Sequence, residues 1–149
     1  MKRALLLVAL AAVALPGSAW AHAALLKTVP SASVTVNTPP KHVALTYSEA
    51  VAPRFAIVSV TDAAGTQETA GRPARSASNP DELDVPLAPH LHQGWYLVFW
   101  RVISEDGHPV RRAFTFAIGP NPGPAPAFQI PSLSETAVTR SECWIEKAT

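Results

Sequence analysis

Short β-type segments separated by turn-forming residues are the feature that most limits how this chain can fold. About seven such segments lie between residues 24 and 118, and clusters of Pro, Gly, Asn and Asp separate them. Three of the segments place apolar side chains at every second position: Val43, Leu45 and Tyr47; Leu83, Val85 and Leu87; Phe114, Phe116 and Ile118. This period is typical of strands with one buried face, and almost no segment has the period of a helix. We therefore predict an all-β fold, a Greek-key immunoglobulin-like sandwich or barrel of about seven strands.

One further segment has a different pattern. The run from Trp95 to Ile103 is apolar at nearly every position except Arg101. A strand with one solvated face alternates, whereas a strand covered on both faces does not. We predict that this run is a central strand that is covered on both sides.

The beginning of the chain has the layout of a secretory signal. Two basic residues precede an apolar run from Ala4 to Leu15, and small residues at Ala19 and Ala21 fit the requirements of signal peptidase. The run is well short of the roughly 20 residues that a membrane-spanning helix needs. We predict that residues 1–21 are a cleaved signal peptide and that the mature, exported chain begins at His22.

Composition limits the remaining possibilities. The chain has 12 Lys and Arg against 11 Asp and Glu, which favours neither a nucleic acid nor an anionic surface as partner. Cys143 is the only cysteine, so the predicted domain, residues 22–119, has to be stable without an intramolecular disulfide; pairing with another chain stays open. Prolines at every second position from Pro120 to Pro126 predict an extended linker, and we expect residues 120–149 to be this linker and a poorly ordered tail.

Asp106 and His108 are the most informative pair of polar residues. On extended backbone, residues two apart lie on one face, so both side chains can bind one ion. A loop Asp that caps a turn beside a surface His is the alternative. Cleavage after Ala21 would add the α-amine and Nδ1 of His22, and the resulting set of nitrogen and oxygen donors suits Cu(II), with zinc as the main competitor. The only methionine is Met1, so a dedicated Cu(I) site is not expected in the mature chain.

The other histidines are predicted to lie outside this site. His90 and His92 are separated from Asp106 by a long extended segment, which places them at the opposite end of the domain. We interpret them as part of a solvated turn, with adventitious metal binding as the alternative. His42, at the start of a predicted strand, is interpreted as a surface residue.

Several of these motifs occur together in a known family. The chain carries the His-Ala pair at residues 22–23, Tyr-Ser-Glu at 47–49, Trp-Arg-Val-Ile-Ser-Glu-Asp-Gly-His-Pro at 100–109 and Phe-Thr-Phe at 114–116. Over about residues 22–119 it resembles the CopC family of bacterial periplasmic copper-binding proteins. The chain lacks the methionine-rich loop of some members, and Arg111 and Arg112 stand where smaller residues are common, so the rim of the site is expected to be more basic than usual.

The resemblance implies a function as well as a fold. It implies a Greek-key β-barrel that binds one Cu(II) per chain through His22, Asp106 and His108, and it implies that Glu49 accepts a hydrogen bond that orients the amine or a bound water. It also implies a periplasmic copper carrier or buffer that serves copper resistance or supplies a CopD-like inner-membrane protein, and no catalysis. Two alternatives remain at this point: a copper monooxygenase with an N-terminal His, and a metal-free immunoglobulin-like binding module.

Overall fold

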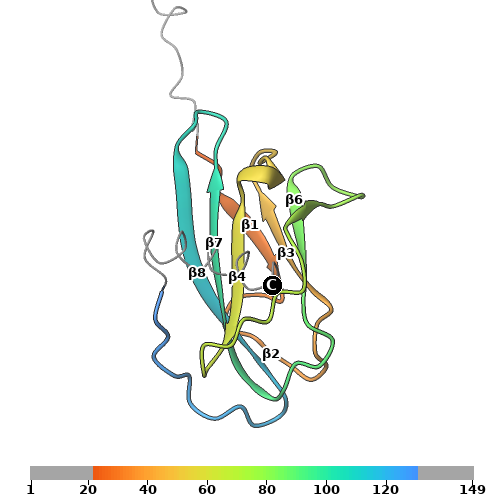
Figure 1. Cartoon of the computed structure of the whole chain (residues 1–149), viewed down its shortest axis with the longest axis vertical. Helices are drawn as coiled ribbons and strands as arrows, with labels where there is room; N and C mark the ends of the chain where they lie inside the picture. Colours follow the sequence, from red (N-terminus) through yellow and green to blue (C-terminus); the bar gives the residue numbers. More distant parts are fainter. Residues whose placement is uncertain (1–21, 131–149) are drawn as a thin grey trace, which may run out of the picture.

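The computed structural model describes residues 22–130, and their regular structure is almost entirely β-strand (Figure 1). One sheet has the order β1-β3-β6-β5 and the other has the order β2-β8-β7-β4. The strands of the first sheet are β1 (Leu25–Val29), β3 (His42–Tyr47), β6 (Glu82–Pro86) and β5 (Ala74–Arg75). Those of the second are β2 (Thr35–Val36), β8 (Pro109–Ile118), β7 (Gly94–Ile103) and β4 (Ile57–Asp62). A short 3-10 helix, η1 (Pro53–Phe55), precedes β4.

The predicted all-β Greek-key sandwich is confirmed. The alternative, a closed barrel, does not occur among the described residues. Within residues 22–130 no ladder joins β1 to β8, so the strands remain in two separate sheets. The described residues 22–130 form eight strands, where about seven were expected. The strands β2 and β5 have two residues each, which is too short to produce an alternating pattern in the sequence.

The predicted alternation corresponds to the core between the sheets. Val43 and Leu45 on β3 lie opposite Val85 and Leu83 on β6, and all four are fully buried or nearly so. From the other sheet, β7 contributes Tyr96, Val98, Trp100 and Val102 to the same core. Burial of these side chains supplies the main stabilising free energy of the domain, at roughly 25 cal/mol per Å² of apolar surface.

The strand β7 is central and covered on both faces, as its continuous apolar run predicts. It lies between β8 and β4. Its side chains Leu97 and Phe99 point away from the core between the sheets, yet they are only 5% and 3% exposed.

The linker after β8 turns back along the domain (Figure 1). Gly119 has a φ of +93°, and a Cβ there would lie 2.5 Å from Cγ of Gln93, so only glycine fits this turn. The Gln93 amide then donates to the carbonyl of Asn121 at 3.0 Å, and the Trp95 indole donates to the carbonyl of Gly123 at 2.9 Å. Residues 120–130 contain no strand or helix, and these two hydrogen bonds attach the first part of the linker to the domain.

Two predictions concern residues outside the described range. The signal peptide with its cleavage point after Ala21, and the tail with Cys143, both fall there and stay predictions. No helix within residues 22–130 has the length and apolar character needed to cross a membrane.

Candidate metal site

His22 is placed by the backbone that follows it. Ala23 is 1% exposed, which fixes the start of the segment in the core. The Ala24 N–H donates to Oγ of Ser48 at 2.9 Å, and the Ser48 N–H donates to the Ala24 carbonyl at 2.8 Å. These contacts hold the segment beside the end of β3 while the His22 side chain remains 66% exposed.

Asp106 and His108 lie in the tight loop 104–108 that joins β7 to β8. The Ser104 N–H donates to the His108 carbonyl at 3.0 Å, and the Gly107 N–H donates to the Ser104 carbonyl at 2.9 Å. Gly107 has a φ of +83°, a left-handed conformation that side-chain-bearing residues rarely adopt. The expectation of extended backbone at Asp106 and His108 is therefore wrong. Their side chains converge because the loop turns, and the two-residue spacing on a strand is not the cause.

Hydrogen bonds within the loop hold the Asp106 carboxylate. Its Oδ1 lies 2.7 Å from Oγ of Ser104 and accepts from the His108 N–H at 3.1 Å. The pKa of Asp106 is lowered from 3.8 to about 2. The main cause is the hydrogen bond that the Ser104 hydroxyl donates to the carboxylate, and the second is the hydrogen bond from the backbone N–H of His108. The carboxylate is therefore ionised at neutral pH, and its second oxygen, Oδ2, is left to face the two imidazoles.

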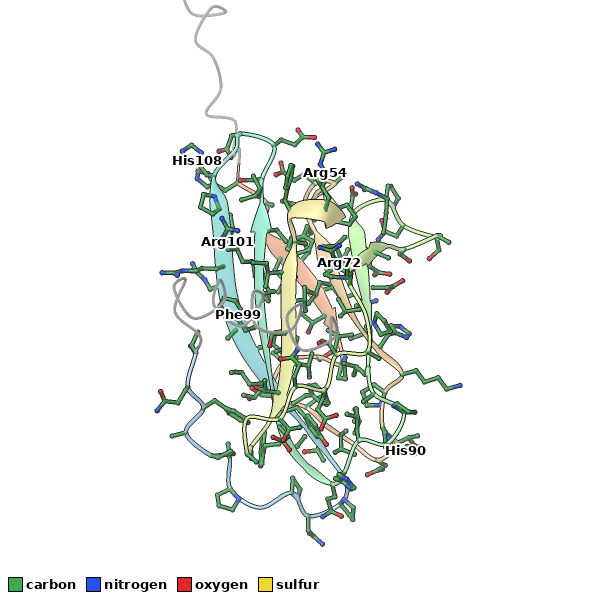
Figure 2. The ribbon with its side chains drawn as sticks, viewed as in Figure 1. Arg54, Arg72, His90, Phe99, Arg101 and His108 are labelled. Atoms are coloured by element: carbon green, nitrogen blue, oxygen red, sulfur yellow. The ribbon has the colours of Figure 1, made fainter. Side chains whose placement is uncertain are left out.

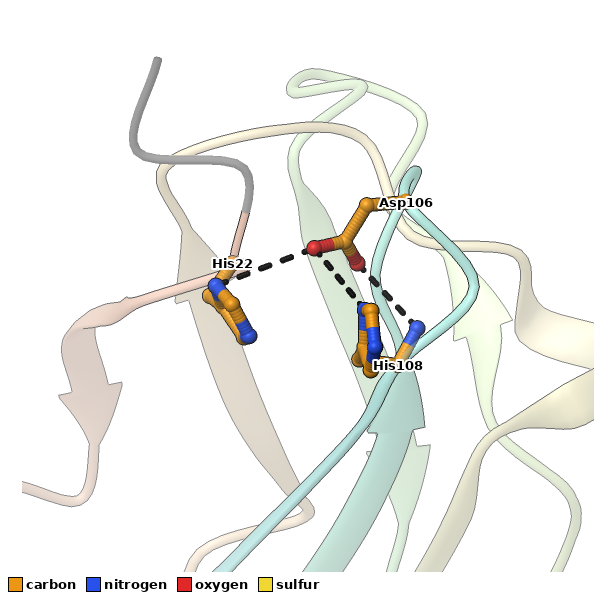
Figure 3. A group of neighbouring side chains, drawn as sticks. All are labelled: His22, Asp106 and His108. Atoms are coloured by element: carbon orange, nitrogen blue, oxygen red, sulfur yellow. Dashed lines mark hydrogen bonds and ion pairs between the residues drawn. The ribbon is translucent and has the colours of Figure 1, made fainter. Parts of the chain in front are cut away.

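The three predicted ligands meet at one end of the sandwich (Figure 3). Oδ2 of Asp106 lies 3.1 Å from Nδ1 of His108 and 3.7 Å from Nδ1 of His22. The two imidazole rings are stacked, with centroids 5.4 Å apart and planes at 28°. One donor atom from each residue lies within 4.8 Å of the others.

This arrangement fits a small N/O-binding ion. At metal–ligand distances of about 2 Å, donors on opposite sides of an ion are about 4 Å apart, and the donor atoms here lie within 4.8 Å of one another. His22 and His108 are 66% and 67% exposed, so rotation of their side chains can close the difference without disturbing the core. In the printed sequence the nitrogen of His22 follows Ala21 in a peptide bond, so it becomes a fourth donor only after cleavage there.

Two polar residues support the loop, and one of them was not found from the sequence. Glu49 is one of the two: its Oε1 accepts a hydrogen bond from the N–H of Glu105 at 3.0 Å, and this contact holds the loop. Orientation of the amine or of a bound water by Glu49 stays a prediction. Ser104, which is 4% exposed, was missed. Its position two residues before Asp106 is a signal for a local side-chain hydrogen bond, although a weak one.

The remaining sequence candidates lie elsewhere. His90 and His108 are at opposite ends of the molecule (Figure 2), and His90 and His92 are exposed in the segment between β6 and β7. His42 is exposed at the start of β3, as predicted. Arg111 and Arg112 are exposed on β8, close in sequence to His108.

The fold and the site together define a small β-sandwich protein with a candidate copper site of two imidazoles and one carboxylate at one end of the sandwich. The model of the CopC domain matches residues 25–119, and the chain belongs to the CopC family. The predicted family is thus confirmed.

Curated and solved relatives agree with this assignment. Protein YobA of Escherichia coli K12 is 34% identical over 101 residues, covering 68% of this chain and 82% of that protein. Copper resistance protein C of Escherichia coli is 33% identical over 107 residues, covering 68% and 84%. The crystal structure of CopC from Methylosinus trichosporium OB3b superposes with a TM-score of 0.60 at 33% identity, covering 70% of this chain and 100% of that one.

Proposed function

We propose that the mature protein is a periplasmic Cu(II) carrier or buffer that binds one ion per chain through His22, Asp106 and His108. The observation that carries the proposal is the approach of both Nδ1 atoms to one carboxylate oxygen, at 3.1 and 3.7 Å, from two different sheets. With the α-amine of His22, the donors form a set of three nitrogens and one oxygen. Copper(II) ranks highest among the divalent first-row metals for such a set.

The oxidation state follows from what the chain lacks as well as from its donors. The solved relative PcoC of Escherichia coli is titled a methionine-rich copper resistance protein, and it matches this chain at 28% identity with a TM-score of 0.58. Here the only methionine is Met1, which falls within the predicted signal. The one thiol, Cys143, lies beyond the proline-rich linker, so the predicted domain 22–119 has neither a thioether nor a thiolate that would favour Cu(I).

The geometry suits capture and transfer. The ionised Asp106 carboxylate attracts a cation, and its hydrogen bonds to the loop hold it in place before the ion arrives. The exposed imidazoles can exchange ligands with a partner without unfolding of the core. No proton transfer or bond cleavage is needed, so the proposed role is not enzymatic.

We further propose a membrane protein of the CopD type as the partner. Copper transport protein CutJ of Bacillus subtilis is 28% identical to this chain over 107 residues, and the matched part is 20% of that protein. A domain of this kind is thus part of a longer copper transport protein. This supports transfer of copper to a membrane transporter, either for copper resistance or for delivery.

The proposal is tested by the N-terminal donor. A chain that begins at His22 is compared with a chain that keeps Ala21 in front of it, and both are titrated with Cu(II) by calorimetry and electron paramagnetic resonance. We expect much weaker binding and a changed spectrum for the extended chain, because an amide replaces the amine. As a control, the same extension on a His90→Ala, His92→Ala background should weaken binding as much as it does in the unsubstituted chain, because those histidines lie outside the proposed site. Equal affinities and spectra for the two unsubstituted chains would refute the four-donor site.

A further inference from the structure

The outward face of the sheet β2-β8-β7-β4 carries two large apolar side chains that are buried although the residues paired directly with them are smaller. Leu97 and Phe99 belong to this face, since their neighbours Tyr96, Val98 and Trp100 point into the core. Phe99 lies opposite Ser59 on β4 and Ala113 on β8, which are too small to cover an aromatic ring. Nevertheless, Phe99 is 3% exposed and Leu97 is 5% exposed.

The same face is basic. Arg101 on β7 lies directly opposite Arg111 on β8, and like charges in such a pair repel each other. A hollow of about 250 Å³ adjoins Arg101 and is lined also by Arg54, Phe55 and Ile57. Among residues 22–130 no carboxylate forms an ion pair with these arginines. A partner for this face therefore needs both apolar side chains and carboxylates.

The chain itself leads to this face. Trp95 belongs to the outward side of β7, and its indole holds the carbonyl of Gly123, so the linker is attached there. In Figure 1 the linker then runs back along the side of β8. Residues 131–149 follow, and at about 1.5 to 3.3 Å per residue they can span roughly 30 to 60 Å. The ten-residue strand β7 is about 33 Å long by the same measure, so the segment is long enough to cross the face.

The segment 131–149 also has the required chemistry. It contains Leu133, Trp144 and Ile145 as large apolar residues. It contains three acids, Glu135, Glu142 and Glu146, against two basic residues. We propose that residues 131–149 dock on the outward face of β4, β7 and β8, with their apolar side chains over Leu97 and Phe99 and their carboxylates near Arg101 and Arg111. This proposal is independent of the metal site.

A spin label on Cys143 tests the docking in the full mature chain without copper. Cys143 is the only cysteine, so the label is specific. We expect the amide signals of β4 and β7 to lose most of their intensity, while those of β3 and β6, in the sheet behind, lose much less. Arg111→Glu should restore much of the lost intensity, because it removes one arginine and adds repulsion. Lys27→Glu, an equal change of charge at an exposed position on β1, should leave the pattern unchanged.

Other results would overturn the proposal. Equal loss of intensity in both sheets, or no loss in either, would mean that the segment does not dock here. Mixing spin-labelled chains with isotope-labelled chains that carry no spin label distinguishes another occupant. If β4 and β7 lose intensity in that mixture, then a second copy of the chain covers the face and the intramolecular assignment is wrong.

Discussion

The two ends of the sandwich carry similar sequence signals and differ in structure. At one end Asp106 and His108 are two residues apart, and at the other end His90 and His92 have the same spacing. Among the residues that the structure describes, only the first pair is joined by a third candidate ligand, His22, from the side of the other sheet. Between His90 and His92, Leu91 is buried at 6% exposure, and none of the ion pairs within residues 22–130 involves either histidine. The spacing of two potential ligands is therefore not sufficient for a site, because the third donor and the hydrogen bonds that hold the loop come from tertiary structure.

Removing histidines at one end or the other should give the largest contrast. Loss of a residue that only orients a metal ligand weakens metal binding by roughly 10- to 100-fold. We expect His108→Ala to weaken Cu(II) binding by more than this, because the variant loses a ligand itself. The double variant His90→Ala, His92→Ala should bind Cu(II) as the unsubstituted chain does. Calorimetric titration of chains that begin at His22 measures both. Equal losses at the two ends would contradict the difference between them.

Acid should release copper through the nitrogen donors. Imidazole and amine must be deprotonated to bind a metal, so protons compete with Cu(II) as the pH falls. The lowered pKa of Asp106 means that its carboxylate stays ionised until the pH approaches about 2. The ionised Asp106 carboxylate therefore stabilises the loop at every pH above the ordinary carboxyl pKa. This stabilisation is lost only as the pH falls through the lowered pKa that Asp106 has in the folded chain. Spectroscopic titration of the loaded protein from neutral pH to pH 4 should show copper released, while the copper-free protein keeps its native loop amide shifts over the same range. Simultaneous loss of both would contradict this order.

The contact of Glu49 with the loop predicts an intermediate effect. Glu49→Ala removes the acceptor of the Glu105 N–H, so the loop that carries Asp106 and His108 loses an anchor. We expect Cu(II) affinity to fall by about 10- to 100-fold. Glu49→Gln retains an acceptor oxygen and should recover most of the affinity. If Gln were as damaging as Ala, the charge of Glu49 would matter more than its hydrogen bond to the loop.

The smallest effect is expected at the end that holds His92. The Tyr96 hydroxyl donates to the His92 carbonyl at 2.7 Å. Burial, reinforced by Glu68 and Asp62, raises the pKa of Tyr96, so the hydroxyl keeps the proton that it donates. Tyr96→Phe should lower the free energy of unfolding by about 0.5 to 1.5 kcal/mol and leave Cu(II) affinity unchanged. Denaturant titration and calorimetry of one preparation measure the two quantities, and a clear change in affinity would mean that the two ends are coupled.

Most of the fold could be predicted because strand periodicity is a local property. The alternation at Val43, Leu45 and Tyr47 and the continuous run of β7 both appear in the structure as predicted. The strands β2 and β5 could not be predicted, since two residues have no period. The linker was predicted from its prolines, but its return along the domain depends on Trp95 and Gln93, which precede it by 28 residues.

The sequence by itself determined the fold class and the family of this protein, and it contained three candidate ligands with nitrogen and oxygen donors. Tertiary structure decided how these residues meet. His22 is 84 residues before Asp106 in the numbering of the chain, and only the packing of one sheet on the other brings them to 3.7 Å. The backbone at Asp106 and His108 is likewise a turn around Gly107 and not the extended segment that the spacing indicated. Residue type is local, whereas the geometry of a site that spans two sheets depends on the whole fold.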